Sequence, residues 1–159
     1  MILSDTYPIV GNGLGGLPDA IEATVTHEIN GEYEFQMRYP VTGMHYEELQ
    51  SGSIIMAKPD DLTDEQPFRI YRITKPLNGI VTVYARHLCY DMQGIIVEPF
   101  TTDSLTNAFL TIPTKCTPSS PITLTTTRTV ASGMSIAEPR PLWKLLGGQS
   151  GSILDVYGG

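Results

Sequence analysis

Three side chains that could act in nucleophilic catalysis stand at alternate positions of the segment ARHLCYDM: His87, Cys89 and Asp91. Residues two apart on a β-strand project from one face, so a strand here would present all three together. A Cys–His pair can serve as nucleophile and general base. However, side chains two apart on one strand lie roughly 6 to 7 Å apart, too far for a direct hydrogen bond. We therefore favour a structural role for these residues at the exit of a strand.

The segment GNGLGG, residues 11–16, matches the dinucleotide-binding pattern G-x-G-x-x-G. That pattern holds a pyrophosphate only where it follows a buried strand and opens a helix, whose N-terminal amide groups receive the charge. The next residues alternate instead, with apolar Ile21, Ala23 and Val25 separated by polar side chains, which is the period of a half-buried strand. We expect a flexible turn at these glycines and no bound cofactor.

Metal-binding patterns are weak in this chain. His27, His45 and His87 are scattered, and Cys89 and Cys116 form no C-x-x-C pair. The segment PDDLTDEQP, residues 59–67, concentrates four acids but lacks the glycine and the final glutamate of an EF-hand calcium loop. We interpret it as the solvated tip of a hairpin and assign no metal, cofactor or catalytic residue.

Aromatic residues at strand spacing could form a platform for a carbohydrate, although such residues more often belong to a core. The candidates are Tyr33, Phe35, Tyr39, Phe68 and Tyr71.

The totals limit the class of protein. The chain has 159 residues, of which 41% are hydrophobic and 17% charged, as in a globular protein. A net charge of -7 argues against sequence-independent binding of nucleic acid, which needs a basic surface. No apolar run approaches the roughly 18 to 20 residues that span a bilayer, so no membrane span is expected. The beginning MILSDTYPIV lacks the features of a signal peptide, and two cysteines are too few for a disulfide scaffold.

Residues 1–98 are predicted to form a mainly β domain, a small antiparallel barrel or sandwich. The segment EYEFQMRYP alternates apolar and polar side chains, and Asn30-Gly31 before it is a strong hairpin signal. Three further β-rich segments follow, GSIIMAKP, PFRIYRITKP and GIVTVYARHLCY, with a second hairpin turn at Asn78-Gly79. A short helix is expected in MHYEELQ.

Residues 99–159 are predicted to mix helices and strands. Asp103 or Ser104 can cap a helix, ITLTTTRTV alternates like a strand, and Pro141 suits the first turn of a helix that ends at Gly147. Ser150 or Ser152 can cap another short helix. Because two short helices alone bury little surface, we expect a longer protein. Residues 1–159 alone are expected to be mainly monomeric, or weakly associated through exposed Trp143, Leu145 and Leu146.

Four segments follow one another along the chain: NGEYEFQMRYP, QPFRIYRITKP, ARHLCYDM and LWKLLGGQSGSILDVYGG. As an ordered set they resemble the N-terminal region of phage and prophage minor structural proteins, the tail-associated proteins at the tip of siphophage tails. The resemblance covers about residues 20–159. The family usually has leucines after the R/H-x-x-YD element, so Cys89 in HLCYDM is a local variation.

The resemblance implies a fold like that of phage baseplate hub proteins, with a first β-barrel in residues 1–98 and the start of a mixed segment in 99–159. It implies a structural role as a homotrimer in the virion's tail tip, where it contacts the distal tail protein and other tail-tip proteins after synthesis in the bacterial host. It implies no enzymatic activity in these residues, although longer relatives often carry a lytic module. Two alternatives stay open: a cell-wall peptidase or hydrolase that uses His87, Cys89 and Asp91, and a carbohydrate-binding module for host recognition.

Overall fold

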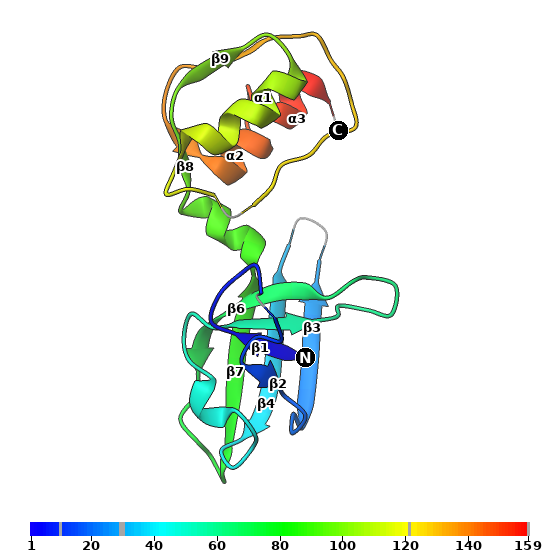
Figure 1. Cartoon of the computed structure of the whole chain (residues 1–159), viewed down its shortest axis with the longest axis vertical. Helices are drawn as coiled ribbons and strands as arrows, with labels where there is room; N and C mark the ends of the chain where they lie inside the picture. The colour runs from blue at the N-terminus through cyan, green and yellow to red at the C-terminus, as the bar shows by residue number, and fades with distance from the viewer. Residues whose placement is uncertain (10, 29–30, 121, 159) are drawn as a thin grey trace. The chain divides into compact units, whose positions relative to one another are not determined.

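The chain folds into two compact units, which we call the N-terminal unit (Met1–Leu88) and the C-terminal unit (Cys89–Gly159). The computed structural model describes residues 1–9, 11–28, 31–120 and 122–158 (Figure 1). The boundary between the units follows Leu88, earlier in the chain than the boundary at residue 98 expected from the sequence. The protein is mixed α+β and mainly β.

The N-terminal unit is built on one antiparallel sheet that curls into a half-barrel. The strands follow the order β2-β1-β5-β6-β7-β4-β3 across the sheet. Their bounds are β1 (Ile2–Ser4), β2 (Gly15–Gly16), β3 (Glu22–His27), β4 (Tyr33–Pro40), β5 (Ile54–Ala57), β6 (Gln66–Ile73) and β7 (Ile80–His87).

The sheet ends in β2 on one side and β3 on the other, and within the described residues neither end strand pairs with the other. A closed barrel, one of the two forms expected from the sequence, would require that pairing. The two residues of β2 offer too few backbone groups to run along the six residues of β3. The half-barrel is therefore open along one side.

The core of this unit follows the predicted alternation. On β4, Phe35, Met37 and Tyr39 are buried while Gln36 and Arg38 between them are exposed. β7 keeps the same period of two, whereas in β6 a register shift between Ile70 and Arg72 interrupts it. The buried cluster also takes in Phe68 and Ile70 of β6 and Val81, Val83 and Ala85 of β7, together with Leu3, Leu17, Leu49, Ile55 and Ala57 from earlier in the chain.

The turns match the predicted hairpins where the structure describes them. Asn78 and Gly79 have φ of 52° and 75°, the two positive values of a tight hairpin turn between β6 and β7. Asn30, in the other predicted turn, lies outside the described residues, but β3 and β4 on either side pair as antiparallel neighbours. The expected helix in MHYEELQ is a single 3₁₀ turn, η1 (Tyr46–Glu48).

The C-terminal unit combines short helices with two small sheets, β10-β8-β12 and β11-β9. The Ser104 hydroxyl accepts a hydrogen bond from the backbone N–H of Asn107 and caps α1. The Ser152 hydroxyl caps α3 in the same way, through the backbone N–H of Asp155. Both serines were among the predicted caps. The elements are η2 (Leu88–Gln93), β8 (Ile96–Val97), β9 (Phe100–Thr102), α1 (Leu105–Thr111), η3 (Ile112–Lys115), β10 (Cys116–Thr117), β11 (Met134–Ile136), β12 (Arg140–Pro141), α2 (Leu142–Leu146) and α3 (Ile153–Tyr157).

Two expectations for this unit are wrong. The threonine-rich residues 122–130 form no strand. The helices α2 and α3 do not lack partners, because Leu142, Leu145, Ile153 and Tyr157 are buried in one cluster with side chains of β8, β9 and α1. Of the three residues expected to be exposed for self-association, Trp143 is 41% exposed, whereas Leu145 is fully buried. Among the described helices, none is long and apolar enough to cross a membrane.

Candidate functional site

The three residues His87, Cys89 and Asp91 do not share a strand. The strand β7 ends at His87, and Leu88–Gln93 form the 3₁₀ helix η2. The period of two that would place the three side chains on one face is therefore lost after His87. The shared strand face that the sequence suggested for these three side chains is therefore not formed.

His87 instead belongs to a stack of rings at one end of the half-barrel. Tyr33 lies between His27 and His87, with ring centroids 4.2 Å and 4.4 Å away and the rings nearly parallel. Phe68 meets the edges of Tyr33 and His87 at 5.4 Å and 5.6 Å. Burial lowers the pKa of His87 below its ordinary value, and the charge of His27 lowers this pKa further. Packing in the stack thus disfavours protonation of the His87 imidazole.

The two cysteines are half-buried thiols. Burial raises the pKa of the Cys89 thiol, and the Asp91 carboxylate raises this pKa further, against the opposing effect of nearby backbone amides. Burial also raises the pKa of Cys116, whose Sγ donates a hydrogen bond to the Ile112 carbonyl at 3.2 Å. Because the thiolate is the nucleophilic form, this environment opposes the use of Cys89 as a nucleophile at neutral pH.

The glycine-rich segment forms a turn followed by strand β2, and no helix follows it, as predicted. Gly11, Gly13 and Gly15 have φ of +65°, +63° and +135°. A Cβ at Gly13 would lie 2.5 Å from the Leu3 carbonyl oxygen, and one at Gly15 would overlap the His45 ring. These glycines let the chain pair β2 with β1 at close range.

The acidic segment is the connection between β5 and β6, which pair as an antiparallel hairpin. Asp60 accepts hydrogen bonds from the Leu62 and Thr63 amides and from the Thr63 hydroxyl, and the hydroxyl bond is the main cause of its lowered pKa. In the part of the chain that the structure describes, no three His, Cys, Asp or Glu side chains are placed to hold one metal ion. Asp60 thus stabilises the turn in this exposed loop.

The five aromatic residues do not form one platform. Phe35, Tyr39 and Phe68 are buried, Tyr33 is in the ring stack, and Tyr71 is 40% exposed. Sequence reasoning missed the surroundings of Tyr71. Its ring lies 6.4 Å from that of Tyr84, and Arg86 and Arg72 lie over Tyr71 and Tyr84 respectively. These side chains come from neighbouring strands, so only the pairing of β6 with β7 brings them together.

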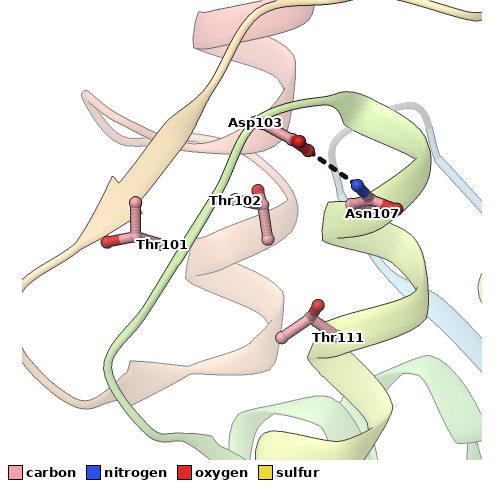
Figure 2. A pocket seen from close by; sticks show the side chains of 5 residues that line it. All are labelled: Thr101, Thr102, Asp103, Asn107 and Thr111. Atoms are coloured by element: carbon pink, nitrogen blue, oxygen red, sulfur yellow. Dashed lines mark hydrogen bonds between the residues drawn. The ribbon is translucent and has the colours of Figure 1, made fainter.

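A shallow polar pocket of about 500 Å³ lies on the C-terminal unit, between β9 and α1 (Figure 2). It is lined by Thr101, Thr102, Asp103, Asn107 and Thr111. Figure 2 shows the Asp103 carboxylate directed at the Asn107 amide, and the two are 2.6 Å apart. The Ser104 hydroxyl also donates to Asp103, and these two bonds lower the pKa of Asp103. The Asp103 carboxylate thus accepts hydrogen bonds from residues at the start of α1. The residues that line the pocket include no histidine, cysteine or lysine.

A second hollow, of about 590 Å³, follows the open side of the half-barrel. Sequence reasoning missed it, because it depends on the sheet failing to close. Ala23 and Val25 of β3 lie on one side of it and Met1 and Ala57 on the other, and Glu65 and Lys58 add charge. The remaining lining residues are Thr24, Phe35 and Pro59. This hollow is the part of the described surface where apolar side chains and free sheet edge coincide.

Comparison of the chain with protein-family models, curated proteins and solved structures finds no match. The family resemblance drawn from the four sequence segments therefore stays a prediction.

Proposed function

We propose that this protein is a structural component of a phage or prophage tail tip, a hub or adaptor subunit that acts through protein–protein contacts. The proposal rests on the ordered resemblance of the four segments to tail-associated minor structural proteins. That ordered resemblance is the observation that carries the proposal. In the structure the four segments form β4, β6, the end of β7 with η2, and the helices α2 and α3, and they contribute side chains to the two buried clusters.

The shape of the N-terminal unit is compatible with that role. A curled antiparallel sheet with a long free edge suits a subunit that completes its surface in an assembly, because such edges otherwise favour aggregation. The proposed assembly is a homotrimeric ring in contact with the distal tail protein. A closed ring requires complementary surfaces on neighbouring copies.

The chemistry of the candidate residues gives the hydrolase alternative little support. Cys89 and Asp91 lie on a 3₁₀ helix, the Cys89 pKa is raised, and His87 is packed against Tyr33. The carbohydrate-binding alternative keeps one supporting observation, the exposed Tyr71 with Tyr84 and two arginines on the outer side of the sheet.

The test is to locate the protein in particles. Antibodies raised against the chain are applied to virions, or to particles released from an induced lysogen, and gold labels are mapped by electron microscopy. The proposal expects label confined to the tail tip, and tailless or tip-defective particles when the gene is deleted. Normal infectious tails after deletion, or particles without the protein in their peptide mass spectra, would refute it.

A further inference from the structure

The strand β3 is a long, regular sheet edge whose single acidic side chain, Glu22, lies 3.6 Å from Arg38 of β4. It pairs with β4 over six consecutive residues without a bulge and contains no proline, glycine or lysine. Natural sheets usually protect an edge by such devices or by keeping the strand very short, as the two-residue β2 does at the other end. Among the described strands, β3 has only β4 as a neighbour.

The register shows which backbone groups of β3 are available. The Glu28 amide donates to the Glu32 carbonyl, so this pair is of the hydrogen-bonded kind. Bonded pairs recur at every second residue of an antiparallel ladder, which places Thr26, Thr24 and Glu22 in bonded pairs with β4. The N–H and C=O groups of Ala23 and Val25 consequently point away from β4, toward the open edge. Figure 1 shows β3 along this edge of the sheet.

The side chains at this edge are apolar on one face and acidic or neutral on the other. Ala23 and Val25 stand opposite the buried Met37 and Phe35, so they share the inner face, yet Ala23 is exposed and Val25 only half-buried. Both line the hollow of about 590 Å³. On the outer face, Glu22, Thr24 and Thr26 are exposed.

The negative charge of the N-terminal unit favours a positively charged partner. The N-terminal unit has twelve acidic and six basic side chains, a formal charge of -6. Pairing β3 with β3 of a second copy would bring two such charges together, whereas a cationic segment would be attracted. An added strand with alternate apolar residues would place these residues over the hollow, since alternate side chains of a strand share a face.

We propose that β3 is a docking edge for an extended cationic segment of a partner protein, which adds to the half-barrel as a further strand. Its apolar residues enter the hollow beside Ala23 and Val25, and its lysine or arginine side chains lie beside Glu22 and Glu28. Backbone hydrogen bonds supply affinity and the alternate side chains supply specificity, as in other cases of strand addition. This proposal stands on the geometry of β3 and does not depend on the assignment to a phage tail.

The test uses the full chain and a fluorescein-labelled peptide of sequence KVKVKVK, with EVEVEVE and the proline-interrupted KVKPKVK as controls. The anisotropy of a small fixed amount of labelled peptide is followed as the protein is added up to about 1 mM, the range of weak association. We expect saturable binding of KVKVKVK alone, with slower amide hydrogen exchange at Ala23 and Val25. No binding, equal binding of EVEVEVE, or protection elsewhere would overturn the proposal.

Two variants locate the binding. Val25→Pro removes an N–H that faces away from β4, so it leaves the β3–β4 ladder intact, and it should weaken binding by about tenfold or more. Ala23→Lys, which places a cation in the hollow, should weaken binding in the same way and is the variant to use if Val25→Pro fails to fold. Thr82→Ser on β7, away from the edge, is the control and should bind normally. Unchanged affinity in a folded edge variant, or a protein that without peptide forms dimers protected at Ala23 and Val25, would contradict the proposed occupant.

Discussion

Tyr33 and His87 lie face to face, with ring centroids 4.4 Å apart and an angle of 15° between the rings. They come from the neighbouring strands β4 and β7, one residue beyond the pair formed by Glu34 and Arg86. His87, which the sequence suggested as a general base, therefore packs against Tyr33 as an aromatic ring. The desolvation that accompanies this packing is the main cause of its lowered pKa.

The lowered pKa of His87 predicts a pH dependence of stability. In the unfolded chain His87 binds a proton near pH 6.5, whereas in the folded chain it binds one only at lower pH. The free energy of unfolding is therefore highest above pH 6.5 and falls as the pH drops toward the folded-state pKa. Because His87 is only partly buried, solvent screening keeps the loss of unfolding free energy below the roughly 1.4 kcal/mol per pH unit that one extra proton bound by the unfolded state would give. His87→Phe keeps a ring in the stack and should flatten the urea-unfolding free energy between pH 7 and 5. Parallel pH profiles for both proteins would contradict this account.

The turn before β2 predicts different costs for two glycine substitutions. Gly13→Ala should lower the free energy of unfolding by about 2–3 kcal/mol, because positive φ and the approach to the Leu3 carbonyl oxygen both oppose a side chain. Gly11 has a similar φ but nothing within 4 Å of its Cβ position, so Gly11→Ala should cost only about 1 kcal/mol. Urea unfolding followed by circular dichroism gives both values, and equal losses would show that the close approach is unimportant.

Strands with a complete period of two could be predicted from the sequence. In β4 and β7, alternate side chains face the core, and this pattern is visible without knowing the partner strand. In β6 a register shift between Ile70 and Arg72 breaks the alternation. The short β1 and β2 could not be found in this way. β1 pairs with β5 on one side and with β2 on the other, and the Leu14 amide donates to the Leu3 carbonyl at 2.8 Å. These partners lie outside the short segments themselves, so no local pattern reveals them.

The threonine-rich residues 122–130 show the converse error. Threonine favours strands, but a strand is stable only with a neighbour that takes its backbone hydrogen bonds, and none pairs with these residues in the described structure. The candidate sites could not be predicted from the sequence for a similar reason. The ring stack and the free edge of β3 depend on the register and the incomplete closure of the sheet, which local patterns do not contain.

The raised pKa of Cys89 predicts a slow thiol. In a Cys116→Ser variant, alkylation of Cys89 by iodoacetamide should require a higher pH than alkylation of the same thiol in urea, because burial disfavours the thiolate. The rate at neutral pH should accordingly be lower in the folded protein at every reagent concentration. Rapid alkylation of folded protein below pH 7 would indicate an activated nucleophile and revive the hydrolase alternative.

Truncation of Leu145 and truncation of Trp143, two residues of the same helix, should cost very different amounts of stability. Leu145 is fully buried in the cluster that joins α2 to α3, β8 and α1, so Leu145→Ala should destabilise the C-terminal unit by about 2–5 kcal/mol. Trp143 is 41% exposed on the same helix, and Trp143→Ala should change stability by about 1 kcal/mol or less. Thermal unfolding followed by circular dichroism measures both without using tryptophan fluorescence. Light scattering of the two variants then tests whether Trp143 also serves in self-association, which its exposure permits and the burial of Leu145 does not. A larger loss for Trp143→Ala than for Leu145→Ala would mean that the helix is turned the other way in the folded unit.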